Sequence, residues 1–349
     1  MTTTTTTTDS VRRAARELAL SIPFGDAAYL GEQLAAHYLH RTEMAAGLGG
    51  PDRGAARALL DALTGAPLAE QVRILGDPAV RATVDGLLIG QWQPSGDRVL
   101  RLAALGPADR PPSIAPGTGI PLSGTSGAPW IWTGDRSADD PFGGVVRRLN
   151  GLHSYGLHLA SPDPRALDAL TAGAALLAAL SPDLAASALA HVRLVGVVAG
   201  DLKDFLSLTN PWLPGAVFLS PGVLTDPWRA AEMLLHEAMH AKFIDLEHTH
   251  AVLAASYRNS DSPGIIPDWH APERNTRWTI KRSLTVMHVY VTLAVFFSLA
   301  DGGRTEAVDR SLDRAVSLHA RLSEHPDQLG HAGRLFLPWI GGLIADLRS

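Results

Sequence analysis

Two histidines lie four residues apart in a stretch whose local sequence strongly favours helix. Residues 229–243 contain no glycine or proline and are rich in alanine, leucine and methionine. The Thr-Asp-Pro signal at 225–227 supplies an N-cap and a first turn. Within this helix His236, Glu237 and His240 form an H-E-x-x-H motif, whose spacing places both imidazoles on one face, where they can bind one metal ion. The alternative is a pair of core histidines bonded to backbone groups.

The composition sets broad limits on the class of protein. The chain has 349 residues, enough for one large domain or two smaller ones, and 46% of them are hydrophobic, which is ample for a core. A formal net charge of −5 and the lack of a basic stripe argue against a nucleic-acid partner. The chain has no cysteine, which excludes disulfides, thiolate metal sites and cysteine nucleophiles. This composition fits a reducing compartment, and we expect a cytoplasmic protein.

Two segments bear on targeting. Residues 1–10 are rich in threonine, lack the basic and apolar regions of a secretory signal, and are predicted to form a disordered tail. Residues 283–300 carry no formal charge over 18 residues, about the lower limit for a membrane span. Because Thr285, His288 and Thr292 interrupt this run, we expect a buried helix and no membrane partner.

The remaining sequence alternates helical stretches with glycine and proline punctuation. Residues 11–106 are predicted to form an N-terminal helical region, 107–143 a Pro/Gly-rich loop or boundary, and 144–349 a C-terminal metal-binding catalytic region. The expected fold class is α+β, predominantly helical, with a small sheet packed beside the H-E-x-x-H helix. We expect helices within 9–48, broken near residue 24, and at 52–64, 77–90, 97–105, 165–190, 226–258, 277–300, 303–324 and 333–347, with strands at 151–160, 191–199 and 215–220.

The usual peptidase patterns do not supply a third ligand for the metal. A metzincin would have glycine and histidine where this chain has Phe243 and Leu246, and the following helix lacks the glutamate signature of a gluzincin. His248 and His250 lie ~12–15 Å beyond His240 along the same helix. We therefore expect these two histidines to be surface or capping groups.

His288 is the best candidate for the third ligand. It is the one histidine of the apolar helix predicted at 277–300, where a buried imidazole needs a partner, and a metal on a neighbouring helix would be one. A core histidine bonded to a carbonyl is the alternative. If His288 is not the ligand, the candidates are His270 in a Pro-rich loop or a nearby carboxylate, Asp268 or Glu273.

Together these segments resemble a known family. Residues 210–220 read NPWLPGAVFLS, residues 226–240 read DPWRAAEMLLHEAMH, and an apolar helix with His288 ends in AVFF at 294–297. Over about residues 190–300 this pattern resembles the H-E-x-x-H proteins associated with ribosomal-peptide biosynthesis. Those proteins are iron(II)- and 2-oxoglutarate-dependent peptide β-hydroxylases.

The resemblance implies a dioxygenase that uses Fe(II), with 2-oxoglutarate and O2 as co-substrates. Its substrate would be a peptide, such as a leader-bearing precursor in natural-product biosynthesis. His236, His240 and His288 would form a facial ligand set, which leaves positions for a bidentate keto acid and dioxygen. Glu237 would lie beside the metal.

2-Oxoglutarate also needs a cation to bind its far carboxylate, the one remote from the keto group. Arg277 and Lys281 precede His288 by eleven and seven residues, so on a helix over 277–300 these three residues share one face. Arg282 follows Lys281 but lies off that face. We expect one of these basic residues to anchor 2-oxoglutarate, and the alternative is solvated charge at the start of a helix.

Two other classes of function remain open. A zinc metallopeptidase would use Zn(II) and Glu237 as the general base that activates a metal-bound water. A non-catalytic binding protein with a structural metal is the third possibility, although structural zinc usually has four protein ligands.

Overall fold

The computed structural model describes residues 3–48, 53–91, 94–110, 117–120, 129–133, 157–200, 205–270 and 276–349. The predicted fold class is confirmed, because the chain is predominantly helical and a small mixed sheet lies beside the helix that carries the H-E-x-x-H motif. The helices are α1 (Thr3–Leu20), α2 (Ala27–Gly47), α3 (Arg53–Thr64), α4 (Leu68–Leu75), α5 (Pro78–Leu88), α6 (Pro94–Ala103), α9 (Pro164–Leu180), α10 (Pro182–Leu189), α11 (Pro227–Thr249), α12 (Ile280–Asp301), α13 (Glu306–Ser323) and α14 (His331–Arg348). The strands are β1 (Gly117–Gly119), β2 (Trp130–Trp132), β3 (Leu157–Ala160), β4 (Leu194–Gly200), β5 (Ser207–Thr209) and β6 (Ala216–Leu219).

The predicted helices form, and local capping fixes several of their ends. Asp26 begins α2 by accepting hydrogen bonds from the backbone amides of Ala28 and Tyr29. Helix α11 is shorter than predicted and ends at Thr249, because the backbone of His250 is extended. Helix α4 and strand β5 were not expected from the sequence.

The Thr-rich N-terminus differs from its prediction. Helix α1 begins at Thr3, so most of the segment predicted as a disordered tail is helical. Threonine costs less than ~0.7 kcal/mol per helical residue relative to alanine, and an existing helix extends more easily than a new one begins. The later turns of α1 are anchored by the buried side chains of Val11, Ala14 and Leu18.

The sheet places a short edge strand beside the motif helix. Its strand order is β1-β2-β4-β6-β5, and β3 pairs with β4 outside this path. Strands β2, β4 and β6 are parallel, whereas β5 runs antiparallel to β6 with Ser207 opposite Leu219 and Thr209 opposite Val217. Because side chains alternate along a strand, Ser207 and Thr209 point to the same face.

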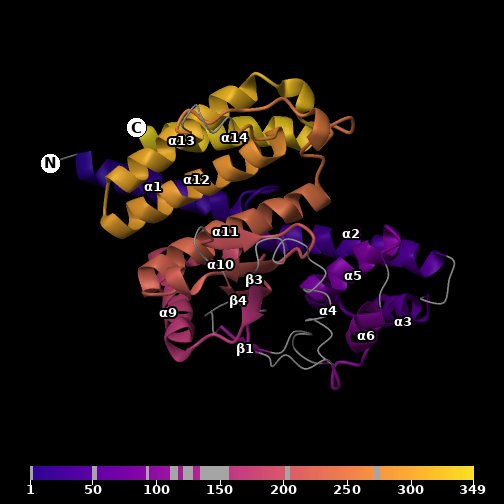
Figure 1. Ribbon diagram of the computed structural model, residues 1–349. Helices are drawn as coiled ribbons and strands as arrows, with labels where there is room; N and C mark the ends of the chain where they lie inside the picture. The colour runs from indigo at the N-terminus through magenta and orange to yellow at the C-terminus, as the bar shows by residue number, and fades with distance from the viewer. Residues whose placement is uncertain are drawn as a thin grey trace.

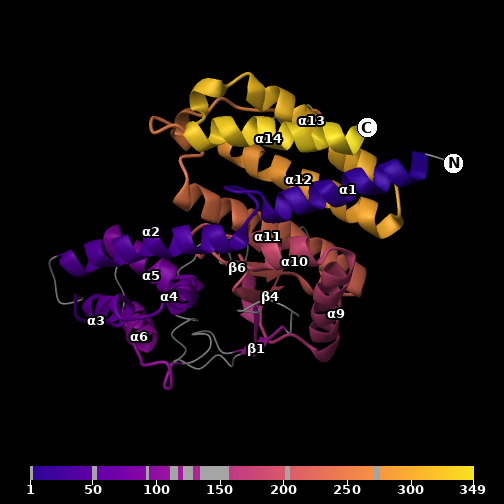
Figure 2. The same cartoon turned by 180° about the vertical axis from the view of Figure 1, so that it is seen from behind.

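Helix α11 lies at the centre of the molecule (Figure 1). Helices α1, α12, α13 and α14 form a group on one side of it, and the sheet with α9 and α10 lies on the other. Figure 2 shows the same arrangement from behind, with α2 to α6 beside the sheet and α2 in contact with α11. Most of the predicted boundary at 107–143 lies outside the described residues, so the division into regions stays a prediction.

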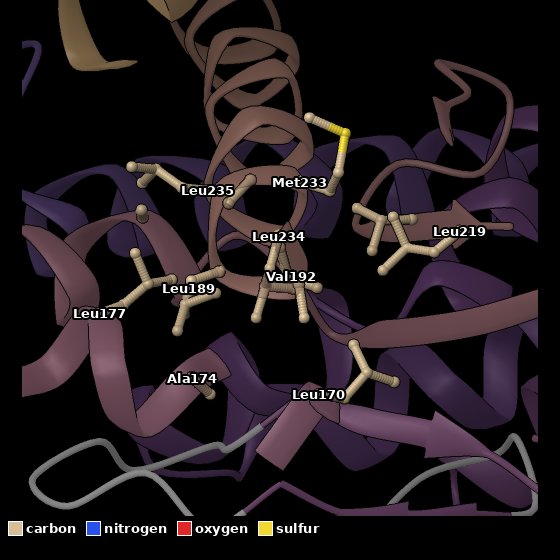
Figure 3. Packing of buried hydrophobic residues seen from close by; sticks show 14 of the residues in the cluster. Leu170, Ala174, Leu177, Leu189, Val192, Leu219, Met233, Leu234 and Leu235 are labelled. Atoms are coloured by element: carbon tan, nitrogen blue, oxygen red, sulfur yellow. The ribbon is translucent and has the colours of Figure 1, made fainter. Parts of the chain in front are cut away.

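One apolar core holds α11 against α9, α10 and the sheet. Leu234 and Leu235 of α11 belong to the same buried cluster as Leu170 of α9 (Figure 3). Gly173 permits the close approach of the two helices, because a Cβ at that position would lie 2.9 Å from the backbone nitrogen of Ala231. The turns that precede the motif are therefore fixed by packing.

Helix α12 is a core helix. Among the described residues it alone is long and apolar enough to cross a membrane, and 72% of its most apolar window is buried inside the protein. His288 and Thr292, which interrupt the apolar run, are fully buried. The prediction of a buried helix is confirmed.

A buried lysine ties α11 to the turn between α1 and α2. Lys242 has no exposed surface, and its Nζ donates to the carbonyl oxygens of Leu18 and Gly25 and to Ser187 Oγ at 2.7–2.9 Å. Replacing Lys242 with methionine keeps much of the side-chain volume but removes the donor to Leu18 and to Ser187 Oγ, while Ser187 Oγ still donates to the carbonyl of Gly25.

We expect Lys242→Met to lower the free energy of unfolding by about 3 kcal/mol, since each orphaned acceptor costs ~1–3 kcal/mol. Urea denaturation measures this loss. As a control, Arg310→Met removes an exposed ion pair with Glu306, which is worth ~0–1 kcal/mol. Equal losses in the two variants would contradict the structural role of Lys242.

Candidate metal centre

The imidazoles of His236 and His240 face each other on one side of α11. Their Nε2 atoms are 3.2 Å apart, and their ring centroids are 4.9 Å apart. Two nitrogens that each bind one metal ion at ~2.0–2.1 Å lie about 2.8–3.4 Å apart in octahedral or tetrahedral geometry. The pair therefore fits two neighbouring ligands of one ion, as the four-residue spacing predicts.

Burial prepares His240 for metal binding. Desolvation lowers the pKa of His240 to about 4, and the nearby positive charge of Arg282 acts in the same direction. A neutral imidazole keeps the lone pair that a metal ion needs. The side chain of His236 is 28% exposed, so the pair can be reached from solvent.

Glu237 points from α11 towards the edge of the sheet. It is 3% exposed, and both of its carboxylate oxygens accept hydrogen bonds of 2.5 Å, Oε1 from Ser207 Oγ and Oε2 from Thr209 Oγ1. Oε1 also lies 3.9 Å from His236 Nε2, so the carboxylate borders the histidine pair. Sequence reasoning missed Ser207 and Thr209. The available signal was their alternation around Leu208, which places two hydroxyls on one face of a strand.

His288 lies on α12, beside α11, with no exposed surface. Its ring packs edge-on against Phe336 at 5.5 Å and at a tilt against Phe243 at 6.2 Å between centroids. Desolvation lowers the pKa of His288 well below its usual value, so the ring is neutral. Within the described part of the chain neither ring nitrogen has a hydrogen-bond partner, and the carbonyl bond expected of a core histidine is not formed. Buried polar groups normally have a partner, and a metal ion is one that this imidazole could take.

The predicted three-histidine set is not assembled in this structure. Among the described residues, no three histidine, cysteine, aspartate or glutamate side chains come close enough to hold one metal ion. His236 and His240 form a pair, while the ring of His288 lies among aromatic rings. The role of His288 as the third ligand stays a prediction, supported by its two unpartnered nitrogens.

The other candidates for the third ligand are occupied elsewhere or not described. Asp268 accepts hydrogen bonds from Ser317 at 2.5 Å and Arg321 at 3.3 Å, which directs its carboxylate to α13. The ring of His270 packs edge-on against Trp278, with centroids 5.2 Å apart. Glu273 lies outside the described residues.

Of the three basic residues proposed as anchors, Arg277 and Lys281 do not fit the predicted role. Helix α12 begins at Ile280, where Thr279 caps it by accepting a hydrogen bond from the amide of Arg282. Arg277 therefore precedes the helix and does not share its face, because Trp278 is held extended by a bridge to Ile265.

Lys281 lies on the predicted face, but its charge is already paired. Its Nζ is 2.8 Å from a carboxylate oxygen of Glu247, two turns beyond His240 on α11. Arg282, which was expected to lie off the face, is exposed and stacks on the ring of Trp278 at 4.6 Å. The positive charge of Arg282 contributes to the lowered pKa of His240. Arg282 is therefore the best placed of the three to bind a ligand at the histidine pair.

His248 also differs from its prediction as a surface or capping group. Its Nδ1 lies 3.2 Å from the hydroxyl of Tyr38 and 3.3 Å from Nη2 of Arg81, and burial is the main reason that the pKa of His248 falls to about 3. His250 occupies the C-cap position of α11 as expected, and its Nδ1 is 2.8 Å from Thr249 Oγ1.

Comparisons with known proteins assign no family to this chain. The sequence matches no protein-family model, and no curated protein is significantly similar to it. The function is therefore inferred from the motif, the resemblance of its surroundings and the geometry of the histidine pair.

Proposed function

We propose that the protein is a non-heme Fe(II)- and 2-oxoglutarate-dependent oxygenase that hydroxylates a residue of a peptide, at a β-carbon, in natural-product biosynthesis in the cytoplasm. His236 and His240 are two of the metal ligands and His288 is the third. Bound iron would activate O2 at the expense of 2-oxoglutarate. The chain itself supplies the ligands, the anchor for the keto acid and the surface that holds the peptide.

The observation that carries this proposal is the state of Glu237. A general base must be free to take a proton from a metal-bound water. Both carboxylate oxygens of Glu237 are instead held by the hydroxyls of Ser207 and Thr209, in a place with 3% exposure. In this position the carboxylate joins α11 to β5 and orients the motif, which supports a structural role for Glu237 over the general base of a peptidase.

Strand β5 provides a reason to expect a peptide substrate. It is the edge of the described sheet, and its backbone pairs with β6 on one side alone. Extended peptides bind such edges by adding a strand. Because Ser207 and Thr209 contact Glu237, a peptide added there would lie close to the histidine pair.

Arg282 is the proposed anchor for the far carboxylate of 2-oxoglutarate. A charge-assisted hydrogen bond is worth ~1.5–3 kcal/mol, and each ~1.4 kcal/mol is a factor of ten in binding. We expect Arg282→Gln to raise the KM for 2-oxoglutarate at least tenfold while metal content stays the same. The matched control is Arg277→Gln, outside the helix, which should leave the KM unchanged. A normal KM in Arg282→Gln would show that Arg282 does not anchor 2-oxoglutarate.

A zinc peptidase is the second candidate, favoured by one distance. Oε1 of Glu237 lies 3.9 Å from His236 Nε2, close enough to reach a water on a metal bound there. The double variant Ser207→Ala/Thr209→Val separates the two functions. If Glu237 is a base restrained by these hydroxyls, releasing it should raise peptide cleavage. If Glu237 orients the motif, the variant should lower hydroxylation and show no cleavage.

A further inference from the structure

A second polar site lies on the opposite side of α11 from the histidine pair. Asp245 follows His236 by nine residues, which on an α-helix is about half a turn out of phase. There it lines a cavity of about 210 Å³ together with Arg81, His191 and Arg193. Residues of α2 and α4, together with Gly76 and Ala190, form the rest of the wall. At ~30 Å³ per water molecule, the cavity has room for a small ligand.

The carboxylate of Asp245 is fully used within the protein. Oδ1 is 2.7 Å from Nη2 of Arg81, and Oδ2 is 2.7 Å from Nδ1 of His191. Asp245, Arg81 and His191 are 3%, 1% and 5% exposed. Asp245 therefore pairs with one of the two guanidinium groups around the cavity, and both of its oxygens are already hydrogen-bonded.

No described residue forms a counter-ion contact with the second guanidinium, that of Arg193. The structure gives its side chain no hydrogen bond or ion pair with any described residue, although Arg193 is mostly buried. The charges of Asp245 and Asp77 act on it from nearby, but Asp245 is bonded to Arg81 and His191, and Asp77 caps α5 by accepting from the amides of Ala79 and Val80. Nε of Arg81 is buried without a partner among the described residues. A buried cation with free donors needs an anion.

His191 adds an acceptor to these donors. Asp245 is held ionised, so it only accepts, and the proton between them belongs to Nδ1 of His191. Burial lowers the pKa of His191 despite the neighbouring carboxylate, so the ring is neutral and Nε2 carries a lone pair. This Nε2 is buried and has no hydrogen-bond partner in the described part of the chain. A ligand that satisfies the cavity must therefore bring negative oxygens and one hydroxyl.

We infer that this cavity binds a small oxyanion that carries a hydroxyl group, with hydrogen phosphate and hydrogen carbonate as the simplest members of the class. Arg193 and Nε of Arg81 donate to its oxygens, and its hydroxyl donates to Nε2 of His191. The site joins α2, α4, α5, α11 and the segment between α10 and β4, so its ligand stabilises the packing behind the motif helix. The inference is independent of the proposed oxygenase function.

The test measures anion binding to the full-length protein by calorimetry and by thermal unfolding at constant ionic strength and pH 7.5. Phosphate or hydrogen carbonate should bind saturably and raise the unfolding temperature, and the tighter of the two identifies the ligand. Sulfate, which has no hydroxyl at this pH, should bind at least tenfold more weakly. Sulfate binding as tight as phosphate would mean an adventitious ion only, and no saturable binding of either anion would also overturn the inference.

Two sets of variants locate the site. Arg193→Gln should weaken the binding of the preferred anion at least tenfold, Arg193→Lys should retain most of it, and the surface control Arg310→Gln should bind normally. His240→Ala should also bind the anion normally, which separates this cavity from a metal at the histidine pair. Undiminished binding in a folded Arg193→Gln variant would contradict the assignment. If that variant does not fold, the preference for phosphate or hydrogen carbonate over sulfate in the unmodified protein still decides.

Discussion

Replacing Asp245 with alanine is expected to cost the protein about 3–5 kcal/mol of unfolding free energy. The carboxylate holds Arg81 and His191 at 2.7 Å each in a place with almost no solvent. Its removal leaves the guanidinium of Arg81 buried and unpaired, which is far more costly than the loss of a surface ion pair. Since domains are stable by only ~5–15 kcal/mol, the variant should approach global instability.

Urea or thermal denaturation measures this effect. The matched control is Asp309→Ala, which removes the exposed ion pair with Arg304 and should cost less than ~1 kcal/mol. The variant Asp245→Asn keeps the shape and the possibility of hydrogen bonds, so its loss should lie between the two. A loss below 1 kcal/mol in Asp245→Ala would show that the buried pair is not formed in solution.

Replacing His236 or His240 with alanine is expected to abolish metal binding and activity together. The two Nε2 atoms are 3.2 Å apart, so each variant leaves only one histidine of the pair beside the proposed ligand His288, one protein ligand fewer than the three of an open metal site. Metal content after dialysis and turnover of the peptide measure the effect. His248→Ala and His250→Ala should keep their metal, because those rings lie further along α11. Stoichiometric metal in either motif variant would refute the site.

The same assay tests the third ligand. His288→Leu should lower metal occupancy as the motif variants do. In the absence of metal this variant should be as stable as the unmodified protein or more so, since its two buried nitrogens have no partner among the described residues. Full metal content in His288→Leu would show that another residue is the third ligand.

The sequence predicts the motif helix well because its signals are local. Asp226 caps α11 at the amide of Arg229, Pro227 begins it, and the four-residue spacing brings His236 and His240 together. None of these contacts depends on another part of the chain. Local propensity and periodicity are enough to find them.

The features that were missed depend on contacts distant in sequence. Lys281 is paired by Glu247 only because α12 packs against α11. Strand β5 has three residues, too few for a periodic signal, and it is held by β6 and by Glu237. The expected position of Arg277 failed for a local reason that was overlooked: Thr279 is a helix cap, so the residues before it cannot share the helix face.

Arg81 and Asp245, which form a buried pair, are 164 residues apart in the sequence. Nothing in the neighbourhood of either residue indicates the partner, because an arginine and an aspartate on helices are normally solvated. The cavity beside them exists only when α2, α4, α5 and α11 are packed together. A cavity of this kind is visible in the structure and not in the sequence.

The most direct test of the proposed function is a single reaction with protein purified and loaded with iron(II) without oxygen. A candidate precursor peptide, 2-oxoglutarate and then O2 are added, and succinate and peptide mass are measured together. We predict one iron per protein, succinate formed in equal amount to the modified peptide, and a peptide product heavier by one oxygen atom. Cleavage of the peptide by the zinc-loaded protein, without oxygen or keto acid, would contradict the proposal and identify a metallopeptidase.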